Sequence, residues 1–140
     1  MTTNPEGWWR DARAQLETAA SLKATGSLHD AYFHAGQAVE FALKAIYMRR
    51  KHLVAWPAEN KGAGWHDLGR IAGLCGVAPD PNMPNYKAVY ANWLTARDWN
   101  SNGRFPDSKP SLREVNDLIT AVCNDQAGVM AWLEAIFQKS

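Results

Sequence analysis

One stretch of the sequence decides the fold: AYFHAGQAVEFALKAI, at residues 31–46. It has no proline and a single glycine, and plotted at ~100° per residue it divides into two arcs. The broad apolar arc holds Ala31, Ala35, Ala38, Val39, Ala42, Ala45 and Ile46. The opposite arc holds His34, Gln37, Glu40 and Lys44, interrupted by Phe33 and Phe41. A helix that is apolar nearly all round is a buried helix, so we expect the central helix of a bundle, carrying one ordered polar row.

The composition is that of an ordinary globular protein. The chain has 140 residues, of which 46% are hydrophobic and 21% charged, and we expect residues 1–140 to form one domain. The formal net charge of +1 gives no general electrostatic attraction to nucleic acid or membrane, although it still allows a local basic patch. Seven tryptophans are many for this length, and we expect most of them in the core or at an interface.

The two cysteines and four histidines form no metal-binding pattern. Cys75 and Cys123 therefore read as reduced core cysteines, and we expect no metal and no cofactor. The polar start of the chain does not resemble a signal peptide, and no run of about 20 apolar residues suggests a membrane span. These features predict a cytoplasmic protein.

Capping residues mark the expected helices. Asn4 and Pro5 open the first helix, which Gly26 ends, and Ser27 caps a second helix that runs to about Leu53. The short link between them predicts an antiparallel pair. The segment His66-Asp67-Leu68 begins a short third helix whose inward residues are Leu68, Ile71, Ala72 and Cys75.

Two more helices complete the expected bundle. The fourth covers about Asn85 to Trp99, and the fifth runs from a capping box at Ser111 towards Phe137, with Gly128 bending it or dividing it in two. The sequence thus predicts an all-α, up-down bundle of four to five helices with one long connection.

The fourth helix has an aromatic face from which Arg97 emerges. Its residues follow helical spacing and are Tyr86, Val89, Tyr90, Trp93, Leu94 and Arg97. Two aromatic pairs lie in this region, Tyr86 with Tyr90 and Trp93 with Trp99. They form either a stacking platform for bases, or a part of the core or of a dimer interface. The basic run of residues 48–52 either complements the helix dipole or binds phosphate.

Three segments resemble the HEPN domain family. The stretch FHAGQAVEFALKA at residues 33–45 closely resembles the signature second helix of that family. His66-Asp67-Leu68 is similar to its His-x-Leu segment, and Arg104-Phe105-Pro106-Asp107 to its Arg-Tyr-Pro-Asp segment. The resemblance spans essentially the whole chain. It implies an all-α bundle, commonly a homodimer, in prokaryotic defence and toxin–antitoxin settings.

The resemblance also implies a possible RNase site, which this sequence does not complete. Many HEPN domains are metal-independent RNases that carry an arginine, a polar residue and, a few positions later, a histidine. Arg97-Asp98 fits the start of that motif, but Asn102 holds the place of the histidine, and no histidine follows His66. RNA cleavage of this kind needs a base and an acid, and an asparagine exchanges no proton near neutral pH. The catalytic candidates are therefore Arg97, Asn102 and Arg104, with His34 or His66 as a substitute histidine.

The polar row of the central helix is expected to form a cluster with the arginines. Glu40 and Lys44 make an i, i+4 pair, and we expect Glu40 to reach Arg97 or Arg104 across the bundle. The residues of this polar cluster, which could equally contact a ligand, are His34, Gln37, Glu40, Lys44, His66, Arg97 and Arg104.

These features favour binding over chemistry. We expect a HEPN-type domain that binds a partner protein, such as a toxin, an antitoxin or a nucleotidyltransferase, and that holds RNA or a nucleotide near Arg97 and Arg104. A metal-independent endoribonuclease using the same region is the alternative. A substrate-binding companion of a nucleotidyltransferase is a second alternative.

Overall fold

The computed structural model describes residues 4–99 and 110–140, and within these ranges every regular element is a helix. The elements are α1 (Pro5–Ala24), α2 (Leu28–Arg50), a 3-10 turn η1 (Ala63–His66), α3 (Leu68–Cys75), α4 (Tyr86–Arg97), α5 (Leu112–Cys123) and α6 (Val129–Lys139). The predicted all-α bundle is therefore confirmed. Within the described ranges, no helix combines the length and apolar character needed to cross a membrane.

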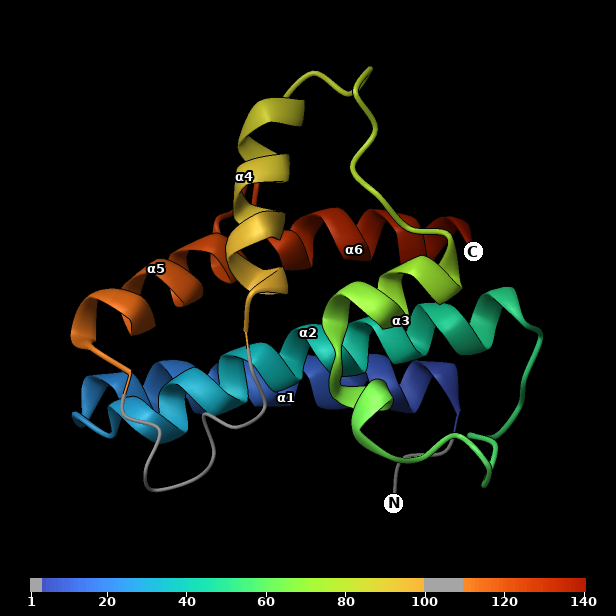
Figure 1. Cartoon of the computed structure of the whole chain (residues 1–140), viewed down its shortest axis with the longest axis horizontal. Helices are drawn as coiled ribbons and strands as arrows, with labels where there is room; N and C mark the ends of the chain where they lie inside the picture. The colour runs from blue at the N-terminus through green and yellow to red at the C-terminus, as the bar shows by residue number, and fades with distance from the viewer. Residues whose placement is uncertain (1–3, 100–109) are drawn as a thin grey trace.

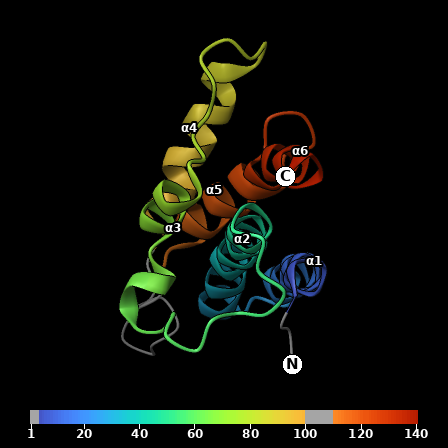
Figure 2. The same ribbon diagram turned by 90° about the vertical axis from the view of Figure 1, so that its right-hand side faces the viewer.

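Helix α2 lies at the centre of the bundle. Figure 1 shows α1 and α2 as an antiparallel pair, with α5 and then α6 following the direction of α2 on its other side. Helix α4 stands steeply across these helices, and α3 packs against α2 near the foot of α4 (Figures 1 and 2). The expected central position of the alanine-rich helix is thus confirmed.

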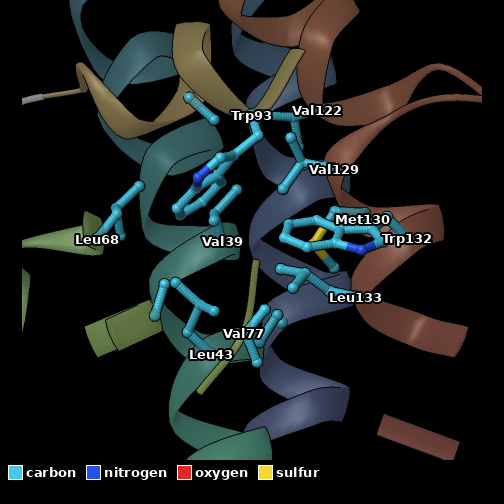
Figure 3. Close-up of a cluster of buried hydrophobic side chains, with 14 of the residues drawn as sticks. Val39, Leu43, Leu68, Val77, Trp93, Val122, Val129, Met130, Trp132 and Leu133 are labelled. Atoms are coloured by element: carbon cyan, nitrogen blue, oxygen red, sulfur yellow. The ribbon is translucent and has the colours of Figure 1, made fainter. Parts of the chain in front are cut away.

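The core gathers around the alanine-rich side of α2. Leu43 and Ile46 are completely buried, as are five alanines of the same helix. Side chains from α3, α4 and α6 meet them there, among them Leu68, Trp93 and Leu133 (Figure 3). Five of the seven tryptophans are buried and two, Trp8 and Trp56, are half-buried, so the tryptophans pack within the protomer.

The helix ends confirm some capping predictions and correct others. The Asn4 side chain accepts from the Gly7 amide at 2.7 Å, and Ser111 with Glu114 forms the expected capping box. Ser27 makes no side-chain capping bond, since its backbone (ψ 70°) is not in the extended conformation that a capping serine needs. Helix α2 ends at Arg50 rather than Leu53, because His52 adopts a left-handed φ of 56°.

The last helices follow one of the two predicted outcomes, and the third helix differs from the prediction. The expected fifth helix is divided before Gly128, because the Asn124 side chain accepts from the amides of Gln126 and Ala127 and turns the chain. A Cβ at Gly128 would lie 2.3 Å from the Asn124 carbonyl oxygen, so this turn needs glycine. His66 does not begin α3 but ends η1, and Asp67 caps α3 by accepting from the Arg70 amide.

The predicted aromatic face of α4 is only partly buried, and the expectation of two core cysteines was wrong. The inward side of α4 is Val89, Trp93 and Ala96, whereas Tyr90 is 40% exposed, since a steep helix touches the bundle along a narrow side only. Of the two cysteines, Cys123 is exposed, and only Cys75 lies in the core. Burial raises the pKa of the Cys75 thiol to about 12, in spite of the nearby charges of Arg50 and Lys51, which act in the opposite direction.

Candidate functional site

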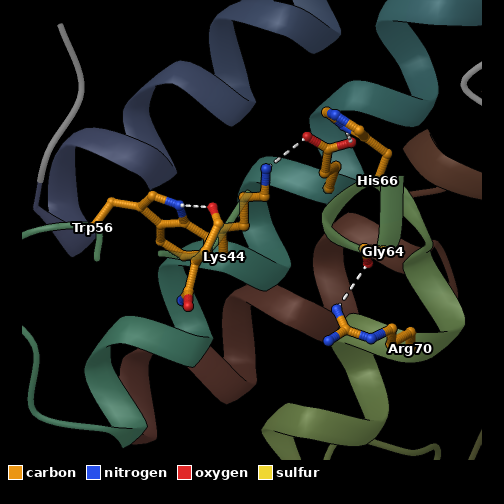
Figure 4. Close-up of polar contacts among 7 residues, drawn as sticks. Lys44, Trp56, Gly64, His66 and Arg70 are labelled. Carbon is orange, nitrogen blue, oxygen red and sulfur yellow. Dashed lines mark hydrogen bonds and ion pairs between the residues drawn. The ribbon is translucent and has the colours of Figure 1, made fainter. Parts of the chain in front are cut away.

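Glu40 is the centre of a buried polar cluster. Its side chain is 2% exposed, and among residues 4–99 and 110–140 each carboxylate oxygen has one partner. Oε2 accepts from Lys44 Nζ at 3.0 Å, and Oε1 accepts from His66 Nδ1 at 2.9 Å (Figure 4). The first partner comes from the next turn of α2 and the second from the end of η1. A buried carboxylate needs such partners, so the cluster ties η1 to the central helix.

Lys44 is enclosed by aromatic rings. Its side chain is 8% exposed, and Nζ lies 5.3 Å from the ring centroids of both Trp8 and Trp56. The negative faces of aromatic rings attract a cation, and the contact is stronger away from water. Trp56 in turn packs against Trp65, the buried residue of η1. Lys44 is thus part of the scaffold and does not reach a ligand at the surface.

His66 is the member of the cluster that reaches solvent. Its side chain is 37% exposed, while Nδ1 is held by Glu40. A carboxylate only accepts, so Nδ1 carries a hydrogen and the orientation of the ring is fixed. Among the described residues Nε2 has no hydrogen-bond partner. His66 therefore presents one oriented ring nitrogen at the surface, able to accept a hydrogen bond or, when protonated, to donate one.

Arg97 lies beside the first turn of α3. Its Cγ and Cδ atoms are each 3.4 Å from the point that a Cβ on Gly69 would occupy, so the missing side chain at Gly69 allows this close packing. Arg97 is exposed, and within residues 4–99 and 110–140 it has no hydrogen bond or ion pair. We call the surface formed by His66, Gly69, Arg70 and Arg97 the His66–Arg97 surface.

Arg70 contributes a second guanidinium group to this surface. Its guanidinium donates to the Gly64 carbonyl at 3.1 Å and lies 4.9 Å from the Trp65 ring centroid. These contacts hold it flat against η1 (Figure 4). Two carboxylates are close in sequence: Asp67, which caps α3, and Asp98, which follows Arg97. The surface thus combines two guanidinium groups and an imidazole with two neighbouring carboxylates, of which Asp67 is engaged in a helix cap.

The structure brings together part of the predicted polar cluster. Glu40, Lys44 and His66 are in contact, and the predicted Glu40–Lys44 pair is present. The predicted link from Glu40 to Arg97 was wrong, because His66 takes the available oxygen and Arg97 packs on Gly69 instead. Asn102 and Arg104 lie outside the described residues.

His34 and Gln37 do not join the cluster. His34 contacts the side-chain oxygen of Gln15 on α1, and burial lowers its pKa, an effect partly opposed by the charge of Asp30. Gln37 is half-buried. The polar row of α2 therefore divides, with His34 directed at Gln15 of α1 and Glu40 directed at His66 of η1.

A contact that sequence reasoning missed fixes the end of α4. The Trp99 indole lies against Gly36, where an added Cβ would be only 2.0 Å from Trp99 Cε2. The indole nitrogen also donates to the Tyr32 carbonyl at 3.1 Å. The single glycine in an alanine-rich helix was the available signal, but the sequence does not reveal its partner. The contact holds the residue two positions after Arg97 on the central helix.

The two arginines at the end of α2 contact the C-terminal ends of other helices. Arg49 donates to the Phe137 carbonyl in the last turn of α6, at 2.8 Å. Arg50 donates to the Cys75 carbonyl at the end of α3, also at 2.8 Å. Both arginines therefore satisfy free carbonyls and complement the dipoles of neighbouring helices. This structural role uses the guanidinium groups that a phosphate site would need.

The same described ranges contain no group of three or more His, Cys, Asp or Glu residues placed to hold a metal ion. Comparison with curated proteins finds no match, and comparison with solved structures finds none. Comparison with family models matches residues 5–124 to the model described as HEPN domain. The resemblance seen in the sequence is thus confirmed: the chain belongs to the HEPN domain family, which points to a nucleotide- or RNA-related or defence-associated role.

Proposed function

We propose that this chain is a non-catalytic HEPN binding domain that holds the phosphate of RNA or a nucleotide on the His66–Arg97 surface. One observation supports the proposal. Glu40 and Lys44 are paired and buried inside the fold, so that only His66 of their cluster reaches solvent. His66 is close in the chain to Gly69, on which Arg97 packs. Charge-assisted hydrogen bonds to phosphate are among the strong ones, and arginine suits them best.

The chemistry of the cluster supports binding rather than cleavage. Metal-independent RNA cleavage needs a base at the 2′-oxygen and an acid at the leaving oxygen. In the described part of the protomer, this surface offers a single imidazole, because His34 is bound to Gln15 on α1. The neutral amide of Asn102, where the family's RNases carry histidine, cannot replace the missing group.

A metal-independent endoribonuclease is the second candidate, and the Glu40–His66 contact favours it. A carboxylate that holds Nδ1 orients a histidine for proton transfer through Nε2. A two-fold homodimer that brought together two such histidines would supply both a base and an acid. This candidate uses the same surface and differs in the fate of the RNA.

The setting and partners also belong to the proposal. We propose a role in defence, toxin–antitoxin or immunity systems, with a toxin, an antitoxin or a nucleotidyltransferase as the partner protein. A substrate-binding companion of a nucleotidyltransferase would use the same phosphate contacts. The homodimer is proposed on family membership alone, because the tryptophans that suggested an interface are buried or half-buried within the protomer.

Incubation with RNA in EDTA tests the proposal. The parent protein and the variants Arg97→Ala and His66→Asn are titrated with fluorescent tRNA and with total RNA. Binding is followed by anisotropy and strand length by gel. We expect full-length RNA throughout, and binding that weakens about tenfold or more in Arg97→Ala, as for the loss of one charge-assisted contact.

Each control variant replaces the same type of residue as one of the two test variants. Arg113→Ala removes an arginine that is 91% exposed on α5, and His52→Asn removes an exposed histidine whose left-handed backbone suits asparagine. Neither is expected to change binding. Specific cleavage that disappears in Arg97→Ala would replace the proposal with the endoribonuclease. An absence of RNA binding by the parent protein would refute the phosphate site.

A further inference from the structure

Helix α4 carries a stripe that ends at Arg97, in which Tyr90 and Arg97 are exposed and Tyr86 and Leu94 are half-buried. At ~100° per residue, Tyr86, Tyr90, Leu94 and Arg97 fall within an arc of about 80°. The buried residues of the helix lie on the adjoining arc, so the stripe borders the core without entering it. One side of α4 therefore presents aromatic rings, an apolar side chain and a cation in line.

The two tyrosines form a pair at the outer end of the stripe. Their ring centroids are 5.5 Å apart with an interplanar angle of 37°, and Tyr90 is 40% exposed. Figures 1 and 2 show that the first half of α4, which carries the pair, rises clear of α1 and α2. The ring pair thus lies on the half of α4 that is farther from α1 and α2, with Tyr90 exposed and Tyr86 half-buried.

Helix α3 contacts α4 at the Arg97 end of this stripe. Arg97 packs on Gly69 in the first turn of α3, whereas a Cβ on Gly73, one turn later, would meet nothing within 4 Å. Figure 1 shows α3 and α4 diverging from the region of that contact. The two helices therefore approach each other near Arg97 and not near the tyrosines.

Arg97, at one end of the stripe, offers an exposed guanidinium to an anionic occupant. It packs on Gly69 in the first turn of α3, and His66 and Arg70 lie close to that turn in the chain. Asp67 accepts from the Arg70 amide as the helix cap, and Asp98 is the one further carboxylate adjoining Arg97 in the chain. A cationic end and an aromatic end on one helix match the phosphate and the bases of a nucleic acid.

We infer that Tyr86 and Tyr90 form a base-stacking subsite for single-stranded RNA whose phosphate is held by Arg97, an inference that rests on the proposed function. Tyr90 and Arg97 are seven residues apart, or ~10 Å along the helix axis. That length spans about three stacked nucleotides at ~3.4 Å each. Aromatic rings bind bases of any sequence, but only unpaired bases expose the faces they stack on.

A comparison of two probes tests this subsite. The parent protein and Tyr90→Ala are titrated with a short oligoadenylate and with an abasic ribose-phosphate strand of equal length. A fluorescent adenine analogue in the oligoadenylate reports stacking. We expect Tyr90→Ala to bind oligoadenylate about 5- to 100-fold more weakly and to lose the stacking signal, with unchanged binding of the abasic strand. Tyr90→Phe should resemble the parent, and Arg97→Ala should weaken both probes.

Leu112→Ala, at a side chain that is 55% exposed on α5, is the matched control, and thermal melts check that each variant folds. If Tyr90→Ala binds oligoadenylate as the parent does, or weakens both probes equally, the subsite is wrong while the phosphate site stands. If the parent binds neither probe, the proposed function fails and the subsite fails with it.

Discussion

Glu40 is 1% exposed, and a carboxylate so deeply buried is tolerated only when its charge is matched. Lys44 and His66 supply that match from two directions, and the rings of Trp8 and Trp56 cover the ammonium group. At the scale of single residues, the motif helix therefore uses its charged side chains to attach η1 and to orient one histidine. The proposed binding function depends on the groups of RNA or nucleotide that His66 and Arg97 contact at the surface.

Replacing Glu40 tests this cluster. Glu40→Gln keeps the shape of the side chain but leaves the buried ammonium of Lys44 without its counter-charge. We expect the free energy of unfolding to fall by about 3–5 kcal/mol, the usual cost of breaking a buried pair. Urea denaturation of the variant measures the change.

A double variant separates charge from packing. Glu40→Gln with Lys44→Met removes both charges, and we expect it to be more stable than Glu40→Gln alone, because uncharged replacements of a buried pair are often tolerated. Glu59→Gln, at an exposed position, is the control. A double variant less stable than the single one would contradict this account of the cluster.

His34 makes stability depend on pH. Burial lowers its pKa in the folded state, so below the ordinary value of 6.5 the unfolded chain binds a proton more readily than the folded one. Stability is therefore expected to fall as pH drops below that value. The melting temperature of the parent should fall more than that of His34→Gln between neutral and mildly acidic pH. Equal falls would show that His34 does not contribute.

The contact between Trp99 and Gly36 acts at the scale of helices. It places the end of α4 on α2 and leaves no room for a side chain at Gly36. Because Arg97 is two residues before Trp99, the same contact holds the arginine beside α3. The position of the proposed phosphate site is thus set by a glycine on a different helix.

Adding one methyl group at Gly36 should expose this dependence. Gly36→Ala forces the Trp99 indole away, and we expect a loss of about 1–3 kcal/mol in unfolding free energy together with weaker RNA binding. A smaller residue at 99 (Trp99→Leu) combined with Gly36→Ala should lose less than the sum of the two single changes.

Gly73→Ala is the control for that experiment. This glycine also lies in a helix, but a Cβ there meets nothing within 4 Å, so alanine should leave stability unchanged or raise it by up to about 1 kcal/mol. If Gly36→Ala were as harmless as Gly73→Ala, the indole would not be a fixed contact.

Local signals in the sequence predicted the helices well and their contacts less well. Asn4, Ser111 with Glu114, and the alanine pattern of α2 are short-range features, and each forms the expected structure. The partner of Glu40 was predicted to be an arginine because arginine is the common choice. Within the described residues, Oε1 instead accepts from His66, which the sequence had placed in the same cluster without showing that it contacts Glu40; Arg104, the other predicted arginine, lies outside those residues.

At the scale of the whole molecule, the family predicts association. We expect sedimentation to give twice the 15.6 kDa mass of one chain at micromolar concentration. The dimer matters because a second copy would decide whether one imidazole or two reach the same RNA. A monomer under these conditions would remove the route to catalysis described for the second candidate, and would leave the binding proposal intact.

An amide NMR titration with short oligoadenylate locates the RNA-binding surface residue by residue. We expect the shift changes to concentrate at His66, Gly69, Arg97 and Tyr90, while the RNA stays intact during the titration. Arg97→Ala should remove most of these changes. Changes confined to the basic end of α2 at residues 48–52, or no changes at all, would show that RNA does not bind at the His66–Arg97 surface.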